Sequence, residues 1–82
     1  MNPQSLIAQN VREWRKFRRL SQQELADRTR LTRTHISNIE RGRGNLTVET
    51  VYHLAQAFNC EVHEILPTLR DATQSVKQKE YP

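Results

Sequence analysis

Side chains that can form paired hydrogen bonds with base edges are concentrated in one short stretch of the chain. With Ile36 at the centre of a buried helical face, six side chains point away from the core or flank it: Arg33, Thr34, His35, Ser37, Asn38 and Arg41. Arginine can bridge guanine, asparagine can bridge adenine, and threonine can contact a thymine methyl group. No acidic residue lies between Asp27 and Glu40. The stretch therefore predicts contacts with bases in the major groove of double-stranded DNA.

Positive charge is concentrated in the same part of the chain. Residues 12–43 hold ten Lys and Arg residues and four acidic residues, a formal charge of +6, and the rest of the chain carries −2. Ten of the thirteen basic residues are arginine, whose planar guanidinium suits phosphate and guanine. Arg41 and Arg43 flank Gly42 at loop positions suited to phosphate. From charge alone, a solvated basic face is the alternative interpretation.

The elements that must position these side chains are predicted to be helices. The apolar spacing is helical throughout, and no stretch alternates as a half-buried strand would. Four residues of types that cap helix starts divide the chain: Ser5, Ser21, Thr32 and Thr47. Gly42 is expected to end the third helix, and Asn59 to end the fourth in the left-handed conformation. A fifth helix is predicted over Glu61–Leu66, before Pro67.

Two of these helices form a tightly connected pair. The second helix directs Leu25 and Ala26 inward, a short turn with Leu31 follows, and the third helix directs Ile36 and Ile39 inward. Two short helices joined this closely cross at a steep angle, and only one face of the second member is buried. The pair therefore leaves the polar face of the third helix open to solvent.

Residues Ile7–Leu66 resemble the phage repressor/Cro-type (Xre-like) helix-turn-helix family. The resemblance is carried by LSQQELA at 20–26, LTRTHISNIERG at 31–42, and matches at Asn45, Thr47–Thr50, Leu54–Ala55 and Glu64–Leu66. It implies an all-α, five-helix, repressor-like DNA-binding domain. We assign this domain to residues 1–66, and a polar tail or short extra helix to residues 67–82. The resemblance further implies a transcription regulator that binds a two-fold operator as a homodimer.

The resemblance also assigns roles to single positions. The base-contacting positions correspond to Arg33, Thr34 and Asn38, with His35 and Ser37 beside them. Gln22 begins the second helix and matches a residue that contacts phosphate and braces the third helix. Arg15 and Glu40 match a pair that forms an ion pair in some members of the family.

Four positions depart from the pattern of the family. Arg19 and Arg30 stand at helix ends where glycine is common, and a non-glycine residue in the left-handed conformation costs about 1–2 kcal/mol. Either these turns are adjusted, or the two arginines lie where they meet phosphate. Leu46 stands where proline is common in the family, and Phe17 stands where a polar residue is usual. We expect the ring of Phe17 to cover either the edge of the core or a partner.

The C-terminal part of the chain is a candidate for dimerisation. Its apolar residues exceed the needs of a small core: Val62, Ile65, Leu66 and Leu69, with Val76 as a further option. A self-complementary patch there would place two recognition helices about 34 Å apart, one turn of DNA. The alternative is that Val62 and Leu66 close the core of each monomer, and that dimerisation depends on DNA.

Other chemistries find little support in the sequence. Paired carboxylates, a nucleophile with a base, and a metal-ligand cluster are all missing, so neither an enzyme nor a cofactor or metal site is expected. No apolar stretch approaches the roughly 18 residues of a membrane helix, and no export signal is recognisable, so we expect a cytoplasmic protein. The alternative function is an antitoxin that binds a protein toxin and autoregulates its operon. Small controllers of restriction–modification systems are a further option within the regulator class.

Overall fold

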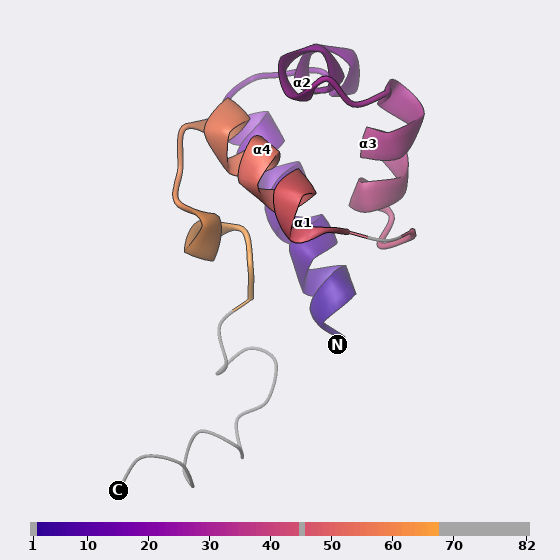
Figure 1. Cartoon of the computed structure of the whole chain (residues 1–82), viewed down its shortest axis with the longest axis vertical. Helices are drawn as coiled ribbons and strands as arrows, with labels where there is room; N and C mark the ends of the chain where they lie inside the picture. The colour runs from indigo at the N-terminus through magenta and orange to yellow at the C-terminus, as the bar shows by residue number, and fades with distance from the viewer. Residues whose placement is uncertain (1, 45, 68–82) are drawn as a thin grey trace, which may run out of the picture.

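The computed structural model describes residues 2–44 and 46–67, which form four α-helices and one 3₁₀ turn (Figure 1). The helices are α1 (Pro3–Phe17), α2 (Gln22–Thr29), α3 (Arg33–Glu40) and α4 (Val48–Phe58), and the 3₁₀ turn is η1 (Val62–Glu64). This part of the chain contains no strand, which confirms the all-α prediction for it. Among the same residues, none of the helices has the length and apolar content that crossing a bilayer requires.

Each α-helix begins where a side-chain oxygen accepts a hydrogen bond from a backbone N–H of the first turn. The capping residues are Asn2, Ser21, Thr32 and Thr47. The last three match the predicted starts, but the start predicted at Ser5 is wrong. Asn2 Oδ1 accepts from the Ser5 N–H at 2.8 Å, and Pro3 occupies the first helical position, where its missing N–H would have had no partner.

The start of α2 carries the predicted capping box. Ser21 Oγ accepts from the Glu24 N–H at 3.0 Å, and Glu24 Oε1 accepts from the Ser21 N–H at 2.8 Å. The hydrogen bond from the Ser21 backbone lowers the pKa of Glu24 below its usual value of 4.5, and the bond to the Ser21 side chain adds to this. The contribution of this box to stability is therefore complete above pH 4.5, and it is lost as the pH falls through the lowered pKa.

Three helix ends adopt the left-handed conformation without glycine. Arg19, Arg30 and Asn59 have φ values of 58°, 62° and 56°. At the end of α2, the N–H groups of Arg30 and Leu31 both donate to the carbonyl of Ala26, as in a left-handed helix cap. The two arginines that stand where glycine is common thus keep the left-handed backbone. The turns are therefore not changed to a conformation that avoids it.

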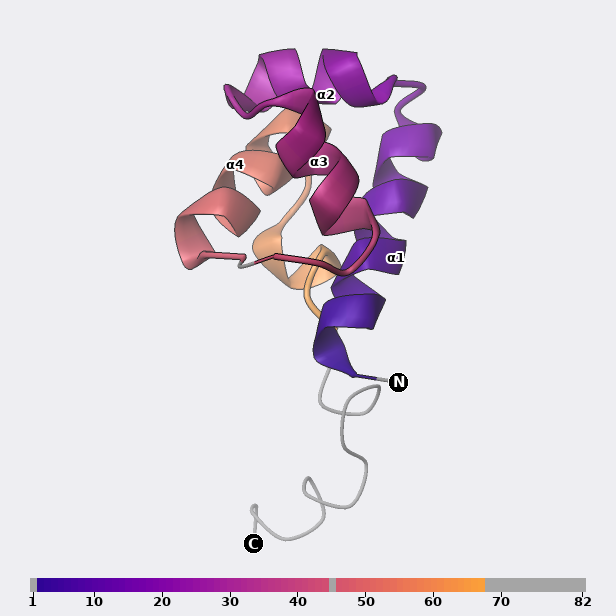
Figure 2. The same cartoon turned by 90° about the vertical axis from the view of Figure 1, so that its right-hand side faces the viewer.

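The core lies between α1, α2 and α4, and the inner face of α3 closes it. Its largest fully buried side chains are Phe58, Leu25, Ile36, Leu54, Ile65 and Val11. Figure 2 shows α2 crossing the top of the molecule and α3 running down its front, with α1 and α4 behind on either side. The outer face of α3 is therefore open along its length.

The segment after α4 differs from the predicted fifth helix. Within residues 59–67, only Val62–Glu64 is helical, as a 3₁₀ turn. Pro67 disfavours helical backbone at Leu66, so too few residues remain for an α-helix with successive i to i+4 bonds.

The predicted dimer contact of Ile65 is also wrong, because its side chain is fully buried in the core of the monomer. Val62 packs partly against the core, and Leu66 is 37% exposed. The predictions for Leu69, Val76 and a further C-terminal helix lie outside the described residues.

Replacing Arg30 by glycine should stabilise the domain. Glycine adopts the left-handed conformation at little cost, so removing the strain should raise the free energy of unfolding by about 1 kcal/mol. A thermal melt should then shift upward by about 4–8 °C for a domain of this size. The matched control is Arg28→Gly, two residues earlier inside α2, which should lower stability by about 1 kcal/mol. A loss of stability in Arg30→Gly would contradict the assignment of strain.

Candidate nucleic-acid interface

The outer face of α3 presents the side chains that were predicted to read bases. Ile36, Ile39 and Glu40 are buried against the core. Arg33 and Thr34 are exposed, and three neighbours are partly buried: His35, Ser37 and Asn38. Figure 2 looks directly onto this side of the helix. The five predicted base-contacting residues thus belong to one solvent-facing element, with Arg33 and Thr34 at its N-terminal end.

Close packing of α2 holds the start of α3 in place. Ala26 is fully buried where α2 approaches α3, and Leu31 in the turn packs partly against the core. Thr29 Oγ1 donates back to the carbonyl of Leu25 at 2.8 Å, which satisfies a buried hydroxyl at the end of α2. Thr32 then accepts from the His35 N–H at 3.0 Å and starts α3. Both sides of the turn are therefore fixed by hydrogen bonds between a threonine side chain and the backbone.

The C-terminal end of α3 is fixed by the predicted ion pair. Arg15 Nε lies 2.7 Å from Glu40 Oε2, and Arg15 Nη2 donates to Glu40 Oε1 at 3.1 Å. The side chains are 16% and 4% exposed, so the pair belongs to the interior of the protein. Arg15 Nη1 also donates to the Leu20 carbonyl, and Arg12 donates to the Glu40 carbonyl. A bidentate pair of this kind holds α3 against α1.

Gln22 belongs to the same network. Its Nε2 donates to Glu40 Oε1 at 3.1 Å, and its side chain is partly buried. The side chain therefore braces α3, in line with one of the two roles that the family resemblance implies. A contact between Gln22 and phosphate stays a prediction, for which its position at the N-terminus of α2 is suitable.

The loop after α3 holds two exposed arginines, Arg41 and Arg43. Between them, Gly42 adopts a φ of +73°, which favours glycine. The Arg43 N–H donates to the Asn38 carbonyl at 2.8 Å, and Gln4 Nε2 donates to the Gly44 carbonyl at 2.6 Å. These bonds fix the backbone of the loop to α3 and α1, so both arginine side chains start from a defined position beside the outer face of α3.

Aromatic side chains gather near the C-terminal end of α1. Trp14 stacks on Phe58, and it also contacts Phe17 edge to face with centroids 5.7 Å apart. Arg18, the C-cap of α1, lies over both rings, and this contact was not predicted. These residues lie away from the face of α1 that contacts α3.

Chemistry based on thiols or metals finds no support among the described residues. Cys60 is partly buried, and burial raises the pKa of its thiol, with a further rise from the nearby carboxylate of Glu64. A raised pKa makes the thiol less reactive. This part of the chain contains no group of three or more side chains that could hold a metal ion.

Four packed helices, a tight turn between α2 and α3, and a polar face on α3 define a helix-turn-helix domain. The family model described as Helix-turn-helix matches residues 11–65. The chain belongs to this family, which confirms the resemblance to phage repressor/Cro-type regulators. It is a DNA-binding transcription regulator and not an enzyme.

Individual relatives agree with this assignment. The control protein C.SmaI of Serratia marcescens is 39% identical over 66 residues, which cover 80% of this chain and 79% of the relative. The HTH-type transcriptional regulator y4dJ of Sinorhizobium fredii is 37% identical over 73 residues, with 89% and 94% covered. The crystal structure of the restriction–modification controller protein C.AhdI from Aeromonas hydrophila superposes with a TM-score of 0.74 at 32% identity. That match covers 76% of this chain and 94% of the controller.

Removing the carboxylate of Glu40 should destabilise the domain strongly. In Glu40→Ala, Arg15 keeps its charge in the interior without a partner, which should lower the free energy of unfolding by about 3–5 kcal/mol. Chemical denaturation followed by circular dichroism measures this loss. The matched control Glu49→Ala removes an exposed carboxylate from the first turn of α4 and should cost about 0.5 kcal/mol. Equal stability of Glu40→Ala and the wild type would show that the pair contributes nothing.

Proposed function

We propose that the chain is a sequence-specific regulator that binds a two-fold operator as a homodimer, with α3 in the major groove. Residues 1–66 form the DNA-binding domain in this proposal. The observation that carries it is the outer face of α3, which exposes Arg33 and Thr34 and is held rigidly from both ends. An α-helix fits the major groove, where each base pair presents a distinct pattern of donors and acceptors.

Within this proposal, the side chains of α3 divide the reading of bases. Arg33 lies in the first turn and suits a bidentate contact with guanine, and Asn38 suits adenine. Thr34 suits a thymine methyl group, while His35 and Ser37 lie at the flanks of the face. The direct contacts are therefore assigned to five residues of a single helix.

Contacts with the DNA backbone are assigned to the elements on either side of α3. Arg41 and Arg43 in the following loop are exposed and suit phosphates on one side, and the N-terminus of α2 with Gln22 suits the other. These contacts set the position of the domain on the duplex but carry no sequence information. They also supply most of the dependence on salt.

Symmetry supplies the remaining specificity. A single helix reads only a few base pairs, which is too little information for a unique site in a genome. A homodimer doubles the site and places the two copies of α3 about 34 Å apart. The segment after α4 lies on the opposite side of the molecule from α3 (Figure 1). Leu66 and the partly buried Val62 are the described residues that we assign to the dimer contact, together with Leu69 beyond them.

We infer that the regulator controls the genes of a restriction–modification system. The names of two relatives support this context, the control protein C.SmaI and the controller C.AhdI. Selection of bound sites from random duplex DNA tests the core of the proposal. We expect a two-fold motif that also occurs upstream of restriction or methylation genes next to the gene of this regulator. A motif without two-fold symmetry would contradict the proposal.

Replacing Arg33 should weaken specific binding more than non-specific binding. Loss of a bidentate contact with guanine should cost about 1–3 kcal/mol on the selected site and relax the choice at one base position. Titrations of Arg33→Ala against the selected site and against random duplex DNA measure both effects. An equal loss on the two DNAs would reassign Arg33 to phosphate.

The matched control for this experiment is Arg43→Ala, which also removes an arginine side chain, but from the loop after α3. It should weaken binding to both DNAs alike and reduce the slope of log K against log salt by about 1. An unchanged slope would remove Arg43 from the interface.

The dimer should form without DNA and should depend on Leu66. Analytical ultracentrifugation at micromolar concentration should show a dimer for the wild type and a monomer for Leu66→Glu. Leu66 is 37% exposed, so this variant should fold, whereas a charge at the fully buried Ile65 would unfold the monomer. Val48→Glu, at an apolar residue that is 87% exposed at the start of α4, is the matched control and should stay dimeric. A monomeric wild type would leave dimerisation to DNA.

A further inference from the structure

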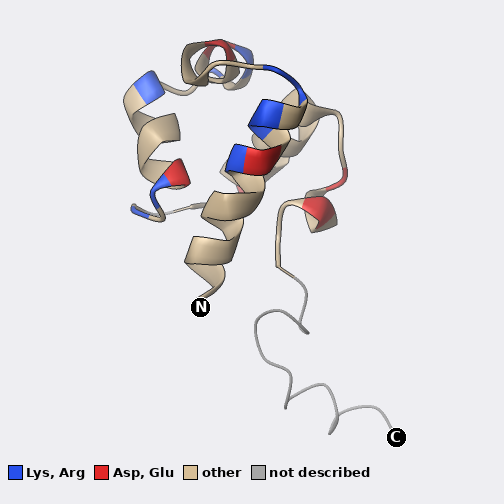
Figure 3. Cartoon of the chain, turned by 180° about the vertical axis from the view of Figure 1, so that it is seen from behind, with Lys and Arg blue, Asp and Glu red and all other residues tan. Residues whose placement is uncertain are grey.

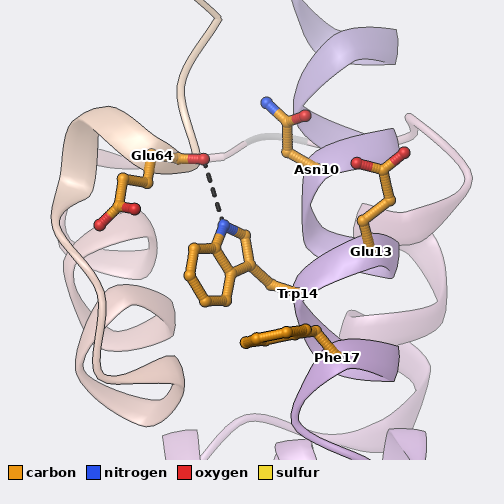
Figure 4. A pocket seen from close by; sticks show the side chains of 5 residues that line it. All are labelled: Asn10, Glu13, Trp14, Phe17 and Glu64. Atoms are coloured by element: carbon orange, nitrogen blue, oxygen red, sulfur yellow. Dashed lines mark hydrogen bonds between the residues drawn. The ribbon is translucent and has the colours of Figure 1, made fainter.

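A pocket between α1 and η1 lies outside the proposed DNA interface. Its volume is about 370 Å³, and it is lined by Asn10, Glu13, Trp14, Phe17 and Glu64. Figure 4 shows the indole of Trp14 at its centre with the ring of Phe17 below, and with Glu13 and Glu64 on opposite sides. The pocket thus combines two aromatic rings with two carboxylates.

The pocket and α3 lie on different sides of α1. Asn10, Trp14 and Phe17 follow the i, i+4, i+7 spacing of one helix face. Arg12 and Arg15, which contact the last residue of α3, lie on the opposite face. Figure 1 also places η1 and α3 on opposite sides of the molecule. A ligand in the pocket therefore leaves the outer face of α3 free for DNA.

Phe17 is not required to fill the core. Phe17 is 69% exposed although it is large and apolar. Trp14 is anchored behind it by stacking on Phe58 and by donation from its Nε1 to the Glu64 carbonyl at 3.3 Å. The indole is therefore held in one orientation, and Phe17 extends the aromatic surface into solvent, where it contributes little to folding.

The rings already hold one guanidinium group. Arg18 Cζ lies 5.2 Å from the centroid of Trp14 and 5.1 Å from that of Phe17, within the range of cation–π attraction. Its Nε donates to the Phe58 carbonyl at 2.7 Å, which fixes this arginine in place. The electrostatic character of the two rings is thus suited to a cation.

The carboxylates are oriented by hydrogen bonds within the protein. Glu13 Oε2 accepts from Gln9 Nε2 at 3.1 Å, and Glu64 Oε2 accepts from the Glu61 N–H at 2.8 Å. Among the described residues, each of these bonds occupies one carboxylate oxygen and leaves the other oxygen available to a ligand. Two such oxygens beside aromatic rings match a planar cation, which stacks on a ring and donates to a carboxylate.

We propose that this pocket is a docking site for an arginine side chain on a basic segment of a partner protein. Charge complementarity selects this occupant, because an acidic segment would be repelled and an apolar one would desolvate two carboxylates without pairing them. Arginine combines a planar stacking surface with five donors, whereas lysine offers only a point charge. The site goes beyond the proposed function, because it gives the regulator a protein-binding surface that DNA leaves uncovered.

Trp14 is the only tryptophan of the chain, so its fluorescence reports directly on the pocket. The full chain without DNA is titrated at low salt with acetyl-Gly-Arg-Gly-amide, and with acetyl-Gly-Gln-Gly-amide as the neutral control. A saturable change with the arginine peptide alone is the expected result. Phe17→Ala and Glu13→Gln should each weaken binding by about two- to fivefold, and both should remain folded by circular dichroism, since both side chains are exposed.

Matched variants outside the pocket separate the site from general effects. Tyr52→Ala removes another exposed aromatic ring, and Glu49→Gln another exposed carboxylate, both on α4, and neither should change binding. An equal response to the two peptides, or unchanged binding in Phe17→Ala, would overturn the proposal. Binding that weakens as the protein concentration rises would assign the pocket to a second copy of the chain and overturn it as well. Because the assay contains no DNA, its result does not depend on operator binding.

Discussion

A carboxylate can remain charged in a protein interior only if opposite charge and hydrogen bonds replace the water that it loses. Glu40 meets this condition through Arg15, which pairs with both of its oxygens, and through Gln22, which donates to one of them. Arg15 belongs to α1 and Gln22 begins α2, so the partners of this one group come from two other helices. The contacts that compensate the charge of Glu40 therefore also fix the end of α3 against the rest of the domain.

The helix α3 depends on this anchoring because it is short. An isolated helix of eight residues is unstable in water, since the cost of its first turn is not recovered over so few hydrogen bonds. Thr32 secures its start, the buried Ile36 and Ile39 secure its inner face, and Glu40 secures its end. Groups that bind DNA precisely need such support, because a side chain on a loosely held helix loses entropy on binding.

The two faces of α1 give the small domain two distinct surfaces. One face carries the arginines that support α3, and the other carries the aromatic rings beside η1 (Figure 3, seen from behind, shows acidic residues on both α1 and η1). Basic charge gathers around α3, with Arg33, Arg41 and Arg43 exposed, whereas two carboxylates border the pocket. The side of α3 is thus basic, whereas the side of the pocket combines two carboxylates with Arg18, which lies over its rings.

Local rules of the sequence determined much of this protein. The capping residues Ser21, Thr32 and Thr47 each act within three residues along the chain, so the starts of α2, α3 and α4 were predictable. The outward face of α3 follows from the helical period around Ile36. The start of α1 was missed because Asn2 and Ser5 are equally good caps by type, and the choice falls to Asn2, which leaves Pro3 at the first helical position.

Tertiary structure decided what depends on residues far apart in the chain. Ile65 became core rather than interface because it is fully buried in one cluster with residues of all four helices, which the local apolar pattern cannot reveal. Gln22 turned toward Glu40, eighteen residues away, because burial of that carboxylate demands a further donor. The sequence by itself therefore determined the starts of α2, α3 and α4 and the polar face of α3, since these need only near neighbours. The packing of α1 against α3 and η1 decided which side chains stay free to bind, because that outcome depends on which surfaces are excluded from water.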